Sequence, residues 1–198
     1  MTGVQTCALP ILLPQQPEAF CFGTVGRLSE VKNHRILIEA FADLSREMPE
    51  ALLVIAGTGE NEAELQRQVE AAGLGERVFF LGYRSDIPRI LNCLDVFLLP
   101  SLREGFGLAM LEAMASRLPV IASRVGGIPE IFGEEDFGIM IDPNNPVELR
   151  DAMKTLANLP QTQREAMGVR ARRRALEHFG AERMIAGYEQ VYQDAYAD

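Results

Sequence analysis

Short apolar runs alternate with amphipathic stretches along the chain from residue 20 onward. The runs have no polar face, which is typical of strands covered on both sides of a parallel sheet. One of them ends at Pro100, because proline cannot continue a central strand. The pattern predicts strands at 20–26, 51–56, 78–81, 95–99, 119–123 and 138–141.

The stretches between these runs carry apolar residues at helical spacing. In the first of them, Leu37, Phe41 and Leu44 fall on one face, and Pro49 ends the pattern. The same spacing predicts helices at 33–48, 60–72, 86–93, 108–116, 128–132, 146–156, 161–178 and 181–197. This alternation indicates an α/β fold: a doubly wound, parallel, six-stranded Rossmann-like sheet with helices on both faces and further helices at the C-terminus. Such folds bind ligands at the carboxyl ends of their strands.

The first residues of the chain fit neither pattern. Residues 1–19 lack a basic n-region and are interrupted by Pro10 and Pro14, so they make a poor signal peptide. Residues 8–11 match the translation of GCT CTT CCG ATC from a common sequencing adapter. We therefore interpret 1–19 as a non-native or disordered leader, with an ordinary flexible arm as the alternative.

Two units follow this leader. Residues 20–180 are predicted to form one domain. Residues 181–198 are predicted to form an amphipathic helix with Met184, Tyr188 and Val191 on one stripe. That stripe must pack either on this domain or on a missing one, and we expect it to pack toward an N-terminal domain that this chain lacks.

Composition and net charge limit the classes of partner that the chain is expected to bind. Hydrophobic residues make up 47% and charged residues 24%, as in ordinary globular proteins. The net charge of −9 argues against nucleic-acid binding, which needs a basic footprint. The arginines of 161–178 are expected to form a solvated face, or a patch for an anionic membrane surface.

The cysteines and histidines suggest no metal site. The three cysteines are scattered, so they predict neither a disulfide framework nor a zinc site, which favours a reducing cytosol. No cluster of His, Cys, Asp or Glu has metal-ligand spacing. Neither histidine has a partner at relay spacing, and His34 is expected on a helix surface. No apolar run approaches the roughly 20 residues that span a bilayer.

The loops after the first three strands carry candidate binding groups. Arg27 and Lys32 follow the first strand, and two cations there can neutralise a diphosphate; plain surface charges are the alternative. Gly57 follows the second strand, but the third glycine of a dinucleotide fingerprint is absent, which disfavours a nicotinamide or flavin cofactor. Gly82, Tyr83 and Arg84 follow the third strand, as a contact for a base or as a plain turn.

Two carboxylates bracket the loop after the fourth strand. Glu104 belongs to the loop and Glu112 to the following helix, with Gly105 and Gly107 between them. The free N–H groups at that helix start favour an anion or an electron-rich oxygen. Carboxylates accept hydrogen bonds from sugar hydroxyls. The alternative is that both glutamates are surface charges.

These segments together resemble the C-terminal donor-binding domain of retaining GT-B glycosyltransferases of family 4, the group called glycosyl transferases group 1. The match extends over residues 20–192. The R-x4-K and E-x7-E spacings are highly specific together, whereas each segment alone is weak. The matching segments are V-G-R-L-S-E-V-K at 25–32, A-G-T-G-E at 56–60, F-L-G at 80–82, P-S-L-R-E-G-F-G-L-A-M-L-E-A-M-A at 100–115, P-V-I-A-S at 119–123 and G-G-I-P-E at 126–130.

The resemblance implies roles for these residues. Arg27 and Lys32 would grip the donor diphosphate and stabilise the leaving group without a metal. Glu104 would contact the transferred sugar, and Glu112 would hold the ribose hydroxyls. The other residues implied to bind the donor are Gly26, Gly57, Gly82, Tyr83, Arg84, Gly105, Phe106, Gly107 and Leu108.

The resemblance also implies a reaction. A sugar would pass with retention of configuration from a UDP-, GDP- or ADP-sugar to a sugar, lipid or small-molecule acceptor held by an N-terminal domain. The resemblance implies no cofactor, because the nucleotide sugar is the donor substrate. The parent enzyme would be cytoplasmic, or peripheral to the inner face of the membrane, and this chain alone would be inactive.

Two other functions stay open, and one residue departs from the family. The chain could be a nucleotide-sugar-binding or regulatory module without activity, or part of a GT-B-fold nucleotide-sugar epimerase, although the E-G-F-G loop fits the transferases better. Arg117 stands where the family usually has glycine. A left-handed conformation there would cost on the order of 1 kcal/mol.

Overall fold

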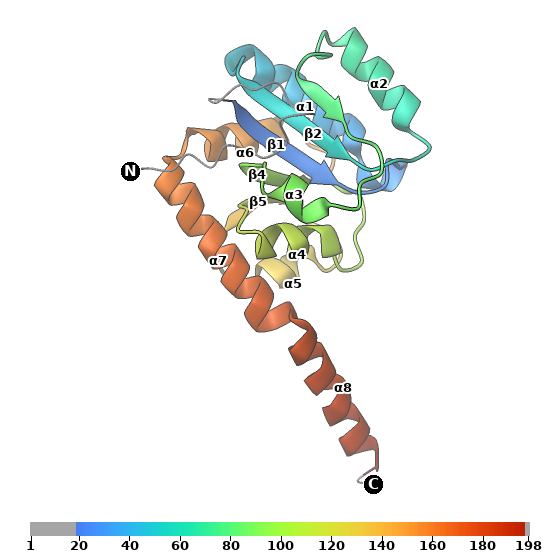
Figure 1. Ribbon diagram of the computed structural model, residues 1–198, viewed down its shortest axis with the longest axis vertical. Helices are drawn as coiled ribbons and strands as arrows, with labels where there is room; N and C mark the ends of the chain where they lie inside the picture. The colour runs from blue at the N-terminus through green and yellow to red at the C-terminus, as the bar shows by residue number, and fades with distance from the viewer. Residues whose placement is uncertain (1–18, 197–198) are drawn as a thin grey trace.

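The computed structural model describes residues 19–196 (Figure 1), so the predicted leader lies outside the described residues except for Ala19. Six parallel strands form one sheet in the order β3-β2-β1-β4-β5-β6. This order confirms the predicted doubly wound fold. The strands are β1 (Phe20–Val25), β2 (Ala51–Ala56), β3 (Val78–Phe80), β4 (Val96–Leu99), β5 (Val120–Ser123) and β6 (Gly138–Ile141).

Helices cover both faces of the sheet. Apolar residues of α1, α2 and α6 share one core cluster, whereas those of α3, α4, α5 and α7 share a second cluster with the alternate residues of the strands. Their bounds are α1 (His34–Glu47), α2 (Glu62–Ala71), α3 (Ile87–Leu91), α4 (Leu108–Ala115), α5 (Ile128–Phe132), α6 (Pro146–Asn158), α7 (Gln161–Phe179) and α8 (Ala181–Tyr196).

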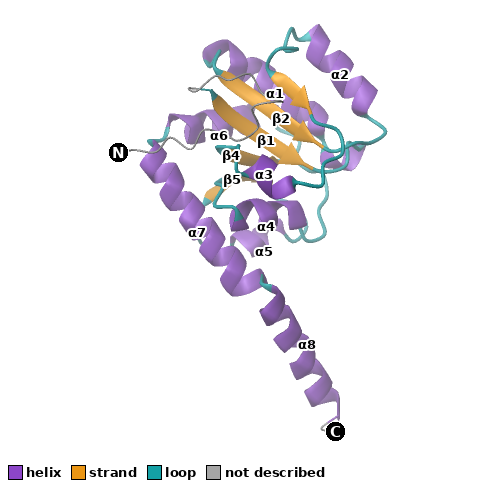
Figure 2. Ribbon diagram, in the orientation of Figure 1, coloured by secondary structure: helices purple, strands orange, loops and turns teal. Residues whose placement is uncertain are grey.

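The strand order reverses beside β1. The chain builds outward from β1 to β2 and β3, then returns to place β4 on the other side of β1. β1, β2 and β3 run parallel, so their carboxyl ends lie at one edge of the sheet, to which the arrowheads of β1 and β2 point (Figure 2). In doubly wound folds a ligand crevice opens at this edge where the order reverses.

One short element was not predicted. A 3-10 turn, η1 (Glu30–Lys32), precedes α1, and Asn33 joins them in a left-handed conformation with φ of 56°. The predicted surface position of His34 is wrong, because its side chain is only 2% exposed. Burial, with the nearby charge of Lys32, lowers the pKa of His34 to about 4.

The arginines of α7 fasten this helix to the domain, so the expected solvated face is only part of their role. Arg174 donates to the carbonyl oxygens of Ile131 and Glu130, and Arg170 donates to that of Asp136. The guanidinium of Arg164 lies 4.8 Å from the ring centroid of Phe20. Contact with a membrane surface stays a prediction.

The last helix extends away from the sheet. α8 continues from the end of α7 beyond the rest of the domain (Figures 1 and 2). None of its described residues is buried, and Met184, Tyr188 and Val191 of the predicted stripe are exposed. What covers this stripe stays a prediction. Within residues 19–196, no helix combines the length and apolar character that a membrane span requires.

Arg117 adopts the strained conformation that a glycine would favour. Its φ is 64°, and its carbonyl oxygen would lie 2.0 Å from a Cβ placed on Gly168 of α7, so α7 packs closely against this turn. We expect Arg117→Gly to raise the free energy of unfolding by about 0.5–1 kcal/mol, since relief of the left-handed strain outweighs the greater freedom of the unfolded chain. Urea denaturation of wild type, Arg117→Gly and Arg117→Ala tests this. An alanine variant as stable as the glycine variant would contradict it.

Candidate functional site

Backbone hydrogen bonds join the loops after β1, β2 and β3. The N–H of Gly26 donates to Ala56 at 3.0 Å, and the N–H of Gly57 donates to Gly82 at 2.8 Å. Gly57 has a φ of 138°, and a Cβ there would lie 1.9 Å from the carbonyl oxygen of Gly26. Only glycine allows this approach. The three loops therefore form one continuous wall at the edge of the sheet.

That wall lines an open cavity of about 520 Å³. Five predicted site residues line it together: Gly26, Arg27, Gly57, Tyr83 and Arg84. Tyr83 is 80% exposed, so its ring is available to a ligand. The structure thus brings together the predicted groups from three strand ends. Glycine backbone, an aromatic ring and two guanidinium groups can receive a planar group and an anion.

Both arginines of the cavity have carboxylate partners. Arg84 makes a two-pronged contact with Asp86, with distances of 2.8 Å and 2.7 Å, and this contact lowers the pKa of the Asp86 carboxyl. Arg27 contacts Glu60 at 3.1 Å, and both side chains are largely exposed. An exposed pair of this kind is worth less than about 1 kcal/mol, so Arg27 can exchange its partner readily.

Lys32 and Glu104 meet across the point where the strand order reverses. Lys32 belongs to η1 after β1, and Glu104 belongs to the β4–α4 loop (100–107). The Lys32 ammonium donates a short hydrogen bond to Glu104 Oε1. Their side chains are 26% and 9% exposed, so this pair is more sheltered than the Arg27 pair. The two strand ends that carry predicted catalytic groups are therefore joined directly.

Two residues that sequence reasoning missed hold this pair. The buried hydroxyl of Ser101 donates to Glu104 Oε1 at 2.9 Å. The side-chain amide of Asn33, next to Lys32, donates to the carbonyl oxygens of Pro100 at 3.2 Å and Pro143 at 2.8 Å. The sequence carries only weak signals for these two residues. Ser101 lies inside the segment 100–115 that resembles the family, and asparagine is among the residues that adopt the left-handed conformation.

The loop that carries Glu104 is pressed by a glycine turn. A Cβ on Gly126 would lie 1.7 Å from the carbonyl oxygen of Glu104, and one on Gly127 would lie 2.7 Å from that of Gly105. Gly107, the residue before α4, has a φ of 72°. The glycine pair after β5 was noted in the sequence, but its contact with this loop was not predictable.

The remaining predicted residues lie on α4 and in the loop before it, and they are not among the residues that line the 520 Å³ cavity. Phe106 and Leu108 are 49% and 67% exposed. Glu112, in the second turn of α4, is exposed and makes no ion pair or side-chain hydrogen bond with any described residue. It is free to accept hydrogen bonds from a ligand.

A second cavity of about 610 Å³ lies beside the starts of α1 and α2 and holds none of the predicted site residues. Its lining includes Glu30, Glu39 and Glu64. Within residues 19–196, no group of three or more His, Cys, Asp or Glu side chains is placed to hold a metal ion.

The sequence matches the family model "Glycosyl transferases group 1" over residues 13–174. It is 33% identical over 174 residues to N-acetyl-alpha-D-glucosaminyl L-malate synthase of Bacillus anthracis, covering 88% of this chain and 45% of the relative. The chain thus spans less than half the length of this curated relative.

Solved structures show the same fold. Anabaena HepE, in complex with UDP and glucose, superposes with a TM-score of 0.80 at 26% identity, covering 92% of this chain and 49% of that one. The C-terminal domain of the glycosyl transferase group 1 protein LpcC from Francisella tularensis superposes with a TM-score of 0.74 at 27% identity. That likeness covers 82% of this chain and 87% of the LpcC domain.

Proposed function

The chain belongs to the glycosyl transferases group 1 family, and on this premise we propose that it forms the donor half of a retaining glycosyltransferase. The observation that carries the proposal is the meeting of two strand ends at one site. Arg27 lines the cavity at the end of β1, and Lys32 contacts Glu104 from the end of β4. The binding of UDP by the similar HepE structure supports a nucleoside-diphosphate sugar as the ligand.

In this proposal the donor replaces the internal partners of the two cations. Its diphosphate takes the Arg27 guanidinium from Glu60 and the Lys32 ammonium from Glu104. Charge-assisted hydrogen bonds to phosphate are strong and suit a group that gains negative charge as it leaves. The same cations that bind the diphosphate therefore stabilise the leaving nucleoside diphosphate.

The carboxylates then act as hydroxyl acceptors. Glu104, released from Lys32 and still held by Ser101, faces the sugar. Glu112 accepts from the ribose hydroxyls. Gly26, Gly57, Gly82, Tyr83 and Arg84 form the wall for the base and ribose, and the backbone of residues 105–108 contacts the phosphate or the sugar.

The rest of the reaction belongs to a larger enzyme. We propose that an N-terminal domain binds the acceptor and that the exposed stripe of α8 packs against that domain. The chain alone then binds the donor but transfers nothing. The parent enzyme is proposed to be cytoplasmic or peripheral to the membrane.

Calorimetry with UDP, GDP and ADP tests this assignment. We expect one of the three to bind the isolated chain and the corresponding nucleotide sugar to bind at the same site, with no transfer to an acceptor. The preferred base identifies the donor. Failure of all three to bind would contradict the donor site. Binding without transfer, even after an N-terminal domain is supplied, would favour a binding or regulatory module.

A further inference from the structure

Phe106 of the β4–α4 loop lies against the C-terminal end of α7. Its ring meets that of Phe179, the last residue of α7, edge to face, with 5.8 Å between centroids and 69° between planes. Phe106 is flanked by Gly105 and Gly107, so the local backbone has little stiffness of its own. A contact from outside the loop is therefore needed to fix its position.

Phe179 is itself held in place. The Arg174 guanidinium lies 5.9 Å from the Phe179 ring centroid. Arg174 in turn donates to the carbonyl oxygens of Ile131 and Glu130 at 2.8 Å and 3.0 Å, which ties it to α5. A Cβ on Gly133 would lie 2.6 Å from this guanidinium, so the glycine leaves the room that Arg174 occupies.

The same short helix supports the loop from its other end. α5 begins directly after Gly126 and Gly127, which lie so close to the carbonyl oxygens of Glu104 and Gly105 that neither leaves room for a Cβ. The loop segment 104–107 is thus held by the glycine turn at one end and by the Phe179 ring at the other. Both supports are anchored through α5.

We propose that Phe179 is a positioning residue of the donor site. Its ring fixes Phe106 and thereby the backbone that carries Glu104 and leads into α4. The expected effect of Phe179 on donor binding rests on the proposed function, whereas its expected effect on the β4–α4 loop does not. α8 begins at Ala181, two residues after Phe179, so whatever α8 packs against acts close to this ring.

Hydrogen exchange and calorimetry on the whole chain test the proposal. In Phe179→Ala we expect amides of residues 103–108 to exchange about two- to tenfold faster, and affinity for the tightest-binding of UDP, GDP and ADP to fall by a similar factor. Phe179→Tyr keeps an aromatic ring and restores both quantities. Leu176→Ala, an exposed position on the same helix, is the control and leaves both unchanged. Phe106→Ala combined with Phe179→Ala binds no more weakly than Phe106→Ala alone.

The outcomes are distinguishable. Unchanged loop exchange in Phe179→Ala, failure of tyrosine to restore it, or additive losses in the double variant would overturn the proposal. Absence of binding by the wild type to all three nucleotides would contradict the donor site instead, and loop exchange would still decide the role of Phe179.

Discussion

Replacing both Arg27 and Lys32 with alanine is expected to lower the affinity for the nucleoside diphosphate at least about 100-fold. A hydrogen bond to a charged group contributes about 1.5–3 kcal/mol, and the double variant removes two such donors from the proposed diphosphate site. Loss of Lys32 also leaves the sheltered Glu104 carboxylate without its cation, facing an anionic ligand. Lys32→Ala alone should therefore weaken binding more than Arg27→Ala.

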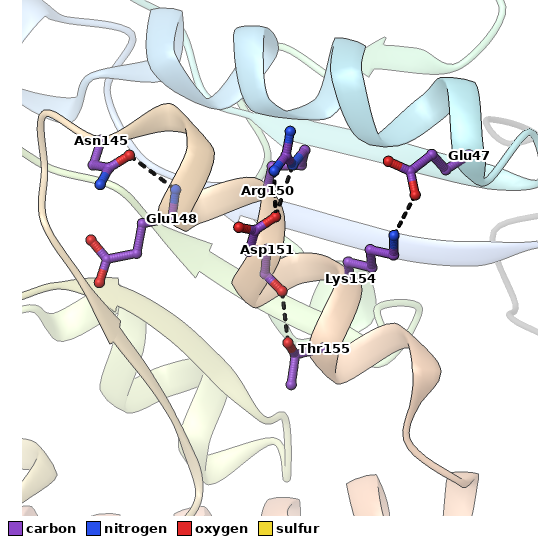
Figure 3. Close-up of polar contacts among 7 residues, drawn as sticks. All are labelled: Glu47, Asn145, Glu148, Arg150, Asp151, Lys154 and Thr155. Carbon is purple, nitrogen blue, oxygen red and sulfur yellow. Dashed lines mark hydrogen bonds and ion pairs between the residues drawn. The ribbon is translucent and has the colours of Figure 1, made fainter.

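A second lysine–glutamate pair supplies the matched control. Lys154 of α6 contacts Glu47 of α1 (Figure 3), and this pair includes none of the site residues. Lys154→Ala makes the same change of charge and should leave nucleotide affinity unchanged. Calorimetry at two salt concentrations measures the nucleotide affinity of the Arg27→Ala/Lys32→Ala double variant and of Lys154→Ala. Equal affinities for wild type and the double variant would contradict the role of the two cations.

Gly126→Ala is expected to be a strongly damaging change in the glycine turn that contacts the β4–α4 loop. The new Cβ would lie 1.7 Å from the Glu104 carbonyl oxygen, and the residue has a φ of 52°. The strain and the forced shift together should lower the free energy of unfolding by about 2–4 kcal/mol. The shift also moves Glu104, so nucleotide-sugar affinity should fall in the fraction that stays folded.

Gly75→Ala is the control for this substitution. A Cβ on Gly75 would meet nothing within 4 Å, and its φ is not positive. Urea denaturation should show a large loss only for Gly126→Ala, with Gly127→Ala intermediate because its contact is 2.7 Å. A Gly126→Ala variant as stable as the wild type would contradict the prediction, because the β4–α4 loop would then move aside without a loss in the free energy of unfolding.

The fold was predictable from the sequence because its signals are local. Fully buried strands appear as apolar runs, and the predicted bounds of β2 and α5 agree with the structure to the residue. The short turn η1 was missed because three residues carry no periodicity. The burial of His34 could have been found: it precedes Leu37 by three positions and Phe41 by seven, on the face that α1 buries.

The site was predictable only in part because its contacts are distant in sequence. Glycines and charges at strand ends identified the cavity wall, since parallel strands end at the same edge. The contact between Lys32 and Glu104, 72 positions apart, follows from the strand order, which no local pattern contains. The support of Glu104 by Ser101 and by the Gly126 turn depends on side-chain and loop packing in the same way.

The position of β1 at the centre of the sheet has a consequence for how the chain folds. Its neighbour on one side, β2, follows it closely in the sequence, but its neighbour on the other side, β4, comes only after β3 and α3 in the sequence. Pairing of β1 with β4 closes the long stretch of chain between them, and the entropy of that stretch is lost before the burial of apolar surface can offset it. We therefore expect this pairing to slow folding. Until β4 arrives, the apolar edge of β1 stays open to pairing with other chains. Rapid dilution from denaturant should therefore favour aggregation more than slow refolding at low protein concentration.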